Sequence, residues 1–170
     1  MTDTLLQELK GETLWLTMNR PKALNAMNKP LVGALRETFD TLKIRQDVRI
    51  VVLRANGKAF CAGLDLQSEG WGTSDSPQAL LAMQRDISDI YRAMRRCPQP
   101  IISLIQGAAC GGGFSLALAS DIRIAATTAK MNAASNATSG SSGNLLHNEQ
   151  ILHGLLKTKL RRKRAFAAIG

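Results

Sequence analysis

The stretch GAACGGGFSLALASD, residues 107–121, places three consecutive glycines directly before a short apolar run. Glycine is a poor helix former and costs about 1 kcal/mol per helical position relative to alanine. The first amides of a helix lack partners within the helix, and the dipole at that end is positive. A glycine-rich helix start can therefore bring a ligand oxygen close to backbone N–H groups.

Two interpretations of Gly111, Gly112 and Gly113 are open from spacing alone. The glycines either let a helix pack closely against a sheet or present amides to an anionic group. A phosphate-binding loop of the Walker type does not fit this segment, because its lysine and its G-x-x-x-x-G-K-[ST] spacing are absent.

Strands and helices are predicted to alternate around this segment, which indicates an α/β fold. Two short strands flank a turn at Gly11, and buried strands are expected within 49–55, 100–108 and 121–126. One helix begins near Asn28 and a second begins at Ser76. The apolar stripes of these two helices are Leu31, Leu35, Phe39 and Leu42, and Leu80, Met83, Ile87, Ile90 and Met94.

Length and composition favour one domain with a proper core, since the 170 residues are 45% hydrophobic and 21% charged. The three cysteines Cys61, Cys97 and Cys110 lack metal-type spacing, and we expect free thiols in a reducing compartment. No secretory signal or apolar run of about 18 residues is found, so the predicted location is the cytoplasm or an organelle matrix.

The formal net charge of +9 is concentrated at one end of the chain. Residues 1–134 carry 16 basic and 12 acidic side chains, whereas residues 135–170 carry six and one. We divide the chain into a core (1–134), a polar linker (135–144) and a basic helical tail (145–170). A basic run can bind nucleic acid or an acidic membrane, but here we expect a solvated surface and no nucleic acid.

The segment GKAFCAGLDL, residues 57–66, repeats the design of the glycine-rich segment. A buried strand ends, small residues follow, and the chain turns. At Ala62-Gly63 the backbone can turn tightly, and this leaves the amide of Leu64 unpaired.

Three segments in order resemble the crotonase superfamily, the enoyl-CoA hydratase/isomerase family. They are NRPKALNAMN (19–28), GKAFCAGLDL (57–66) and the stretch from residue 100 to residue 134 that contains the three glycines. The resemblance implies a spiral of repeated β-β-α units, incomplete at the C-terminus, that assembles as trimers or pairs of trimers. It also implies action on acyl-CoA thioesters, with no metal and no cofactor apart from the coenzyme A of the substrate.

The resemblance places two backbone N–H donors on Leu64 and Gly112, which would form an oxyanion hole for a thioester enolate. Fixed donors stabilise the developing charge without reorganising, and the loss of one costs about 3 kcal/mol. The positions matching the family's substrate contacts are Lys22, Ala23, Leu24, Ala62, Asp65, Leu66 and Gly111.

A proton carrier is missing from the matched segments. Ser115 stands where hydratases of the family have a glutamate, and a serine without a neighbouring base does not cycle protons near neutral pH. The family's second acidic position would lie just beyond Ala134. Asp121 is expected to be structural, Asp65 either binds ligand or shapes its loop, and Glu149 could reach the site from the tail.

Two classes of function follow. The first is an enoyl-CoA hydratase or isomerase of fatty-acid metabolism. The second is a catalytically weak or inactive homologue that binds acyl-CoA or joins full-length relatives. We hypothesise that residues from about Ser135 are a replaced end, produced by a frameshift, splicing or engineering. A family pattern resuming in another reading frame after codon 134 would support the frameshift.

Overall fold

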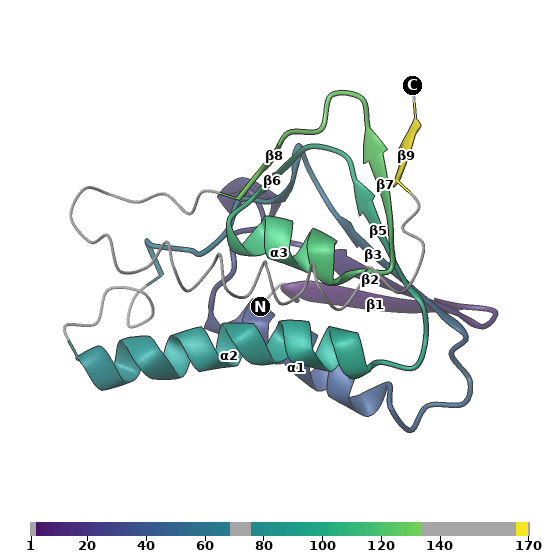
Figure 1. Cartoon of the computed structure of the whole chain (residues 1–170), viewed down its shortest axis with the longest axis horizontal. Helices are drawn as coiled ribbons and strands as arrows, with labels where there is room; N and C mark the ends of the chain where they lie inside the picture. Colours follow the sequence, from purple (N-terminus) through teal and green to yellow (C-terminus); the bar gives the residue numbers. More distant parts are fainter. Residues whose placement is uncertain (1–2, 69–75, 134–165, 170) are drawn as a thin grey trace.

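The computed structural model describes residues 3–68, 76–133 and 166–169, which form a large and a small β-sheet with helices on one side (Figure 1). The strands are β1 (Leu5–Lys10), β2 (Thr13–Met18), β3 (Ile50–Ala55), β4 (Ala59–Cys61), β5 (Ile101–Ile105), β6 (Ala108–Cys110), β7 (Ile122–Ala126), β8 (Met131–Asn132) and β9 (Phe166–Ile169). The helices are the 3₁₀ helix η1 (Pro21–Ala23) and the α-helices α1 (Lys29–Thr41), α2 (Pro77–Arg96) and α3 (Gly112–Ala119).

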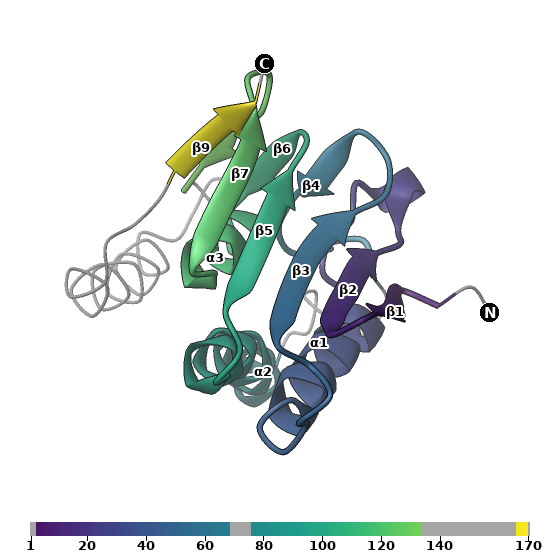
Figure 2. The ribbon, with the colours of Figure 1, turned by 90° about the vertical axis from the view of Figure 1, so that its right-hand side faces the viewer.

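The large sheet has the strand order β1-β2-β3-β5-β7-β9, and the small sheet has the order β4-β6-β8. Only the β1–β2 pair is antiparallel, among the strand pairs of the described residues. Consecutive units therefore place their first strand (β3, β5, β7) in the large sheet and their second (β4, β6, β8) in the small sheet. Figure 2 shows this step repeated along the chain, and the predicted α/β spiral of β-β-α units is confirmed.

Helix starts follow the predicted capping residues. Asn28 Oδ1 accepts the N–H of Leu31 at 3.1 Å at the start of α1. Ser76 Oγ accepts the N–H of Ala79 at 3.4 Å at the start of α2. Each cap satisfies an amide that the helix itself leaves unpaired, and the proline that follows suits the first turn.

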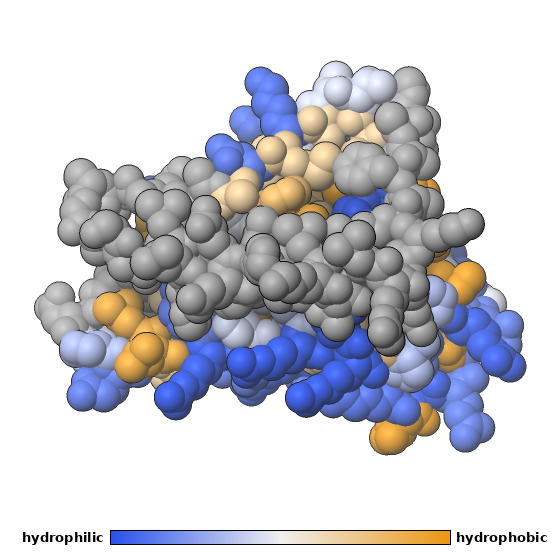
Figure 3. Space-filling model, in the orientation of Figure 1, coloured by the Kyte–Doolittle hydropathy of each residue, from blue (hydrophilic) through white to orange (hydrophobic). Residues whose placement is uncertain are grey.

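One face of α1 and one face of α2 enter the core. The predicted stripe of α1 is fully buried, and so is that of α2 except at its first position. Leu80 is 37% exposed, because the first turn of α2 extends beyond the packed part of the structure. Apart from the exposed Leu80 and Leu81 near its start, the outward side of α2 is hydrophilic along the lower edge of Figure 3. Arg36 on α1 pairs with Asp86 on α2 at 2.7 Å.

The core lies between the large sheet and the helices. Leu14, Val51 and Ile101 are paired across β2, β3 and β5, and all three are buried. The three cysteines are free, as predicted, and Cys61 at the end of β4 is fully buried. Burial raises the pKa of the Cys61 thiol from its ordinary 9.0 to about 12, because the apolar interior disfavours the thiolate.

The short strands were not predicted. β4, β6 and β8 have three, three and two residues, which is too short for an alternating pattern to appear in the sequence. The predicted helical tail is corrected at its end, since Phe166–Ile169 form strand β9 along β7. An edge strand takes its conformation from the ladder beside it, which overrides local preference. The linker and the rest of the tail lie outside the described residues.

No α-helix within the described residues is both long and apolar enough to cross a membrane.

Gly113 and Gly33 make a matched pair for testing how closely the glycines are packed. A Cβ on Gly113 would lie 2.2 Å from the carbonyl oxygen of Cys61, whereas one on Gly33, in α1, would meet nothing within 4 Å. Gly113→Ala should lower the free energy of unfolding by about 1–3 kcal/mol. Gly33→Ala should raise it by about 0.5–1 kcal/mol, through helix propensity. Denaturant titration measures both, and equal stability of the two variants would contradict the packing.

The Cys61 pKa predicts a loss of stability in alkali. Above about pH 9 the thiol ionises in the unfolded chain but stays protonated in the folded one, so unfolding releases a proton and stability falls as pH rises. The unfolding free energy of the wild type minus that of Cys61→Ala should decrease from about pH 9 upward, by at most about 1.4 kcal/mol per pH unit. A pH-independent difference in urea titrations would show that the thiol is not protected.

Candidate active site

The first loop of the candidate site connects β2 to α1 and is fastened by the buried side chain of Asn25. Asn25 Oδ1 accepts the N–H of Arg20 at 2.8 Å. Its Nδ2 donates to the carbonyls of Asn56 and Ala59, each at 2.8 Å, which fixes the loop to the turn between β3 and β4. Asn25 has a φ of 55°, a left-handed conformation that asparagine tolerates better than most residues.

A parallel bridge between Met27 and Leu64 joins the first loop to the second. The N–H of Met27 donates to the carbonyl of Gly63 at 2.7 Å, and the N–H of Asp65 donates to the carbonyl of Met27 at 3.0 Å. In an extended strand, the intervening residue directs its own N–H to the opposite side. The N–H of Leu64 therefore points away from Met27, and it has no acceptor within the described part of the chain.

Gly63 brings the second loop against the glycine-rich segment. Its φ of 102° lies in the region that favours glycine. A Cβ on Gly63 would lie 3.1 Å from the carbonyl oxygen of Cys110 and 3.8 Å from the amide nitrogen of Gly112. The amides of Leu64 and Gly112 thus belong to two turns that touch each other.

The amide of Gly112 is at the first position of α3, where a helix supplies no partner. Hydrogen bonds among the described residues give it no acceptor. On either side, the N–H of Gly111 donates to the carbonyl of Asn132 at 3.0 Å, and the carbonyl of Gly111 accepts the N–H of Ser115 at 3.0 Å. The peptide group between Gly111 and Gly112 is therefore fixed, with its N–H unpaired.

Close packing is confirmed as one reason for the glycines. A Cβ on Gly112 would lie 2.2 Å from Met27 Cε and 3.1 Å from the hydroxyl of Tyr91, and Gly113 is in contact with the backbone of Cys61. Because the side-chain space at Gly112 is filled from the core side, only the backbone of this turn remains to contact a ligand. The packing and the ligand interpretations are compatible.

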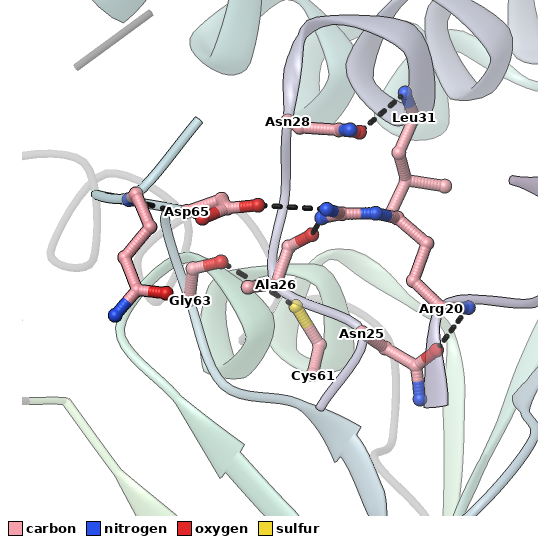
Figure 4. A network of polar contacts seen from close by, with 9 residues as sticks. Arg20, Asn25, Ala26, Asn28, Leu31, Cys61, Gly63 and Asp65 are labelled. Atoms are coloured by element: carbon pink, nitrogen blue, oxygen red, sulfur yellow. Dashed lines mark hydrogen bonds and ion pairs between the residues drawn. The ribbon is translucent and has the colours of Figure 1, made fainter. Parts of the chain in front are cut away.

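An ion pair holds the second loop to the first (Figure 4). Arg20 Nη2 lies 2.7 Å from Asp65 Oδ2, and the two side chains are only 18% and 12% exposed. Asp65 Oδ1 also accepts the N–H of Gln67 at 3.1 Å, and Arg20 Nη1 donates to the carbonyl of Ala26. Charge-assisted bonds in such a partly buried setting are stronger than surface pairs. The carboxylate of Asp65 therefore shapes its loop, which was one of its two predicted roles.

Two hydroxyl groups lie beside the start of α3. Tyr91, from α2, donates to the carbonyl of Gly112 at 3.1 Å, and Ser115 Oγ donates to the carbonyl of Gly111 at 3.3 Å. Burial raises the pKa of the Tyr91 hydroxyl well above its ordinary value, the nearby Cys61 raises it further, and a hydrogen bond with Ser115 acts in the opposite direction. Tyr91 is therefore a neutral donor at physiological pH.

The remaining predicted substrate contacts lie around these loops and differ in burial. Ala23, Ala62 and Asp65 are half-buried and Gly111 is buried, while Lys22, Leu24 and Leu66 are exposed. Leu24 also joins the first loop to the second, because its carbonyl accepts the N–H of Ala62 at 3.0 Å.

Asp121 has the structural role that was predicted. Its Oδ2 accepts the N–H of Ile101 at 3.0 Å, and its own N–H donates to the carbonyl of Ile101 at 2.9 Å. No group of metal-binding side chains occurs among the described residues. Glu149, which was predicted to be able to reach the site from the tail, lies outside the described residues.

Sequence reasoning missed Arg20 and Tyr91. Arg20 is one of many basic residues, and nothing in its spacing points to a partner 45 positions away. Tyr91 is the chain's one tyrosine and lies beside the apolar stripe of α2, where a core role is the simplest interpretation. A hydroxyl within an apolar stripe was the available signal, since a buried tyrosine usually finds a hydrogen-bond partner.

Comparison with known proteins shows which family the chain resembles in sequence and in fold. Residues 8–145 match the sequence model of the family "Enoyl-CoA hydratase/isomerase". A Mycobacterium leprae protein named "Probable enoyl-CoA hydratase echA12" is 34% identical over 98% of this chain and 56% of its own length. The 1,2-epoxyphenylacetyl-CoA isomerase of Escherichia coli K12 is 32% identical over 76% of this chain and 50% of its own length.

The chain thus spans about half the length of the curated relatives it matches. The crystal structure of an enoyl-CoA hydratase from Mycobacterium smegmatis superimposes with a TM-score of 0.75 at 31% identity, over 89% of this chain and 57% of that one. The family match covers the three segments that carry the resemblance and extends to residue 145. The match of residues 8–145 to the family model and the β-β-α spiral of the described residues agree, and the chain belongs to the enoyl-CoA hydratase/isomerase family.

Proposed function

We propose that this chain binds acyl-CoA thioesters and stabilises the enolate of the thioester carbonyl through the N–H groups of Leu64 and Gly112. The observation that carries the proposal is a pair of amides on two touching turns that have no acceptor among the described residues. The contact of Gly63 with Cys110 holds these turns together. The E. coli relative supports the substrate class, because its name states that it isomerises a CoA thioester.

The electrostatics of the site suit a developing oxyanion. The amide of Gly112 lies at the positive end of the eight-residue helix α3. Donors that are already fixed lose no energy in turning toward the charge as it forms, and each one contributes about 3 kcal/mol of stabilisation. The Met27–Leu64 bridge and the Arg20–Asp65 pair provide that rigidity on the opposite side of the site.

The coenzyme A portion of the substrate is proposed to lie along the first two loops. Lys22 is exposed at η1 and can pair with a phosphate, while Ala23, Leu24, Ala62 and Leu66 offer small or apolar contacts. Asp65 contributes by shaping its loop, and Gly111 by positioning the donor turn. The proposed chemistry needs no cofactor beyond the coenzyme A of the substrate. Assembly into trimers or pairs of trimers is a separate part of the proposal.

Proton transfer is proposed to need a group from outside these loops. The segments 19–28, 57–66 and 107–121 contain two carboxylates, Asp65 and Asp121, and both are held by other hydrogen bonds. Ser115 is neutral and is bonded back to its own helix. Glu149 is the candidate for the general base, because it is the one acidic residue after position 134.

Turnover separates hydratase or isomerase activity from binding alone. The purified chain is incubated with crotonyl-CoA and with a 3-enoyl-CoA while the absorbance of the conjugated thioester is followed. We expect slow turnover that Glu149→Gln abolishes, and calorimetry should show tighter binding of crotonyl-CoA than of free coenzyme A. Binding without turnover would favour the second class of function, a homologue that binds acyl-CoA without catalysis. Equal affinity for crotonyl-CoA and coenzyme A would overturn the proposal.

Replacing the Leu64 amide by an ester, with leucic acid at that position, removes one donor without changing any side chain. Acetoacetyl-CoA is a suitable probe, because its enolate has its own near-ultraviolet absorbance and forms by exchange with solvent. Binding to the wild type should lower the pKa of the ligand, and the ester should weaken that effect by about two pKa units. Folding should be retained, since this N–H has no acceptor among the described residues. An unchanged ligand pKa in the ester variant would contradict the role of Leu64.

A further inference from the structure

Two hydroxyl groups donate to consecutive carbonyls at the start of α3. Ser115 Oγ donates to the carbonyl of Gly111 at 3.3 Å, and the hydroxyl of Tyr91 donates to the carbonyl of Gly112 at 3.1 Å. Each hydroxyl has one proton, and each directs it to a different carbonyl.

The carbonyl of Gly111 belongs to the same peptide group as the N–H of Gly112. A peptide whose oxygen accepts hydrogen bonds becomes a stronger donor at its nitrogen, because the bonds polarise the amide cooperatively. This oxygen accepts both the backbone N–H of Ser115, at 3.0 Å, and the Ser115 hydroxyl. Its N–H has no acceptor among the described residues, so the added polarisation is available to a ligand.

A serine bonding back to the carbonyl four residues earlier is common in helices and is usually neutral or slightly unfavourable. The bond of Ser115 differs in two ways. It falls on the peptide whose N–H, that of Gly112, lies beside Gly63 and has no acceptor among the described residues. In addition, the next carbonyl, that of Gly112, is held from the core side by Tyr91, which is buried in α2.

We propose that Ser115 and Tyr91 are positioning residues, which hold the Gly111–Gly112 peptide in place and strengthen its N–H as a donor to the thioester oxygen. This inference rests on the proposed function. Ser115 stands where hydratases of the family have a glutamate, and in this chain its hydroxyl acts through the backbone donor instead of carrying a proton. Tyr91 orients the next peptide through the carbonyl of Gly112.

The test compares the enolate-to-keto ratio of bound acetoacetyl-CoA, at fixed pH, across hydroxyl variants of the full 170-residue chain. Ser115→Ala should lower the ratio about threefold, as expected for loss of cooperative polarisation but not of the donor itself. Tyr91→Phe should give a smaller decrease, and Ser115→Thr should restore the wild-type ratio, because threonine makes the same back-bond. Affinity for free coenzyme A should be the same in every variant.

Ser88→Ala is the matched control, because Ser88 is partly buried in α2 and its side chain has no hydrogen bond within the described ranges. It should leave the ratio unchanged. Ser115→Val and Ser115→Thr form an isosteric pair that keeps the test valid if alanine disturbs the helix. A wild-type chain with no excess of bound enolate would overturn the proposed function. A wild-type excess that persists in both Ser115→Ala and Ser115→Val would overturn only the role of Ser115 and Tyr91.

Discussion

Direct backbone-to-backbone contact at Gly63 and Gly113 is the constraint on which the rest of the structure depends. Gly63 lies against the carbonyl of Cys110, and Gly113 lies against the carbonyl of Cys61, with no side chain between them. The first contact joins the turn after β4 to the end of β6, and the second joins the turn after β6 to the end of β4. Two turns that are 49 positions apart in the chain, from Gly63 to Gly112, therefore become one surface. Any side chain at these glycines would separate the amides that the proposed function requires.

The first loop adds rigidity to this surface through three kinds of interaction. Asn25 fastens it to the β3–β4 turn, Met27 forms the bridge to Leu64, and Arg20 pairs with Asp65. The bridge uses the carbonyl of Gly63 and the N–H of Asp65, on either side of Leu64. It leaves the N–H of Leu64 pointing away from Met27. Rigid donors are what electrostatic stabilisation of an oxyanion needs, because the site does not have to reorganise when charge develops.

The sequence was sufficient for the alternation of strands and helices, because α1 and α2 carry clear apolar stripes and capping residues at Asn28 and Ser76. It also identified the two turns, since three glycines and Ala62-Gly63 are strong local signals. It could not reveal β4, β6 or β8, which are too short to show a period and exist only through pairing with one another. The roles of Arg20 and Tyr91 depend on partners 45 and 21 positions away, and no local pattern encodes such distances.

The most direct test of the proposed oxyanion hole is to observe its two amides when a ligand binds. A ¹⁵N-labelled chain is titrated with crotonyl-CoA and, separately, with coenzyme A, while the amide proton resonances of Leu64 and Gly112 are followed. Both resonances should move downfield together with crotonyl-CoA and stay in place with coenzyme A, because only the thioester supplies an oxygen acceptor. If neither amide moves, or only one of them does, the two turns do not share a thioester oxygen.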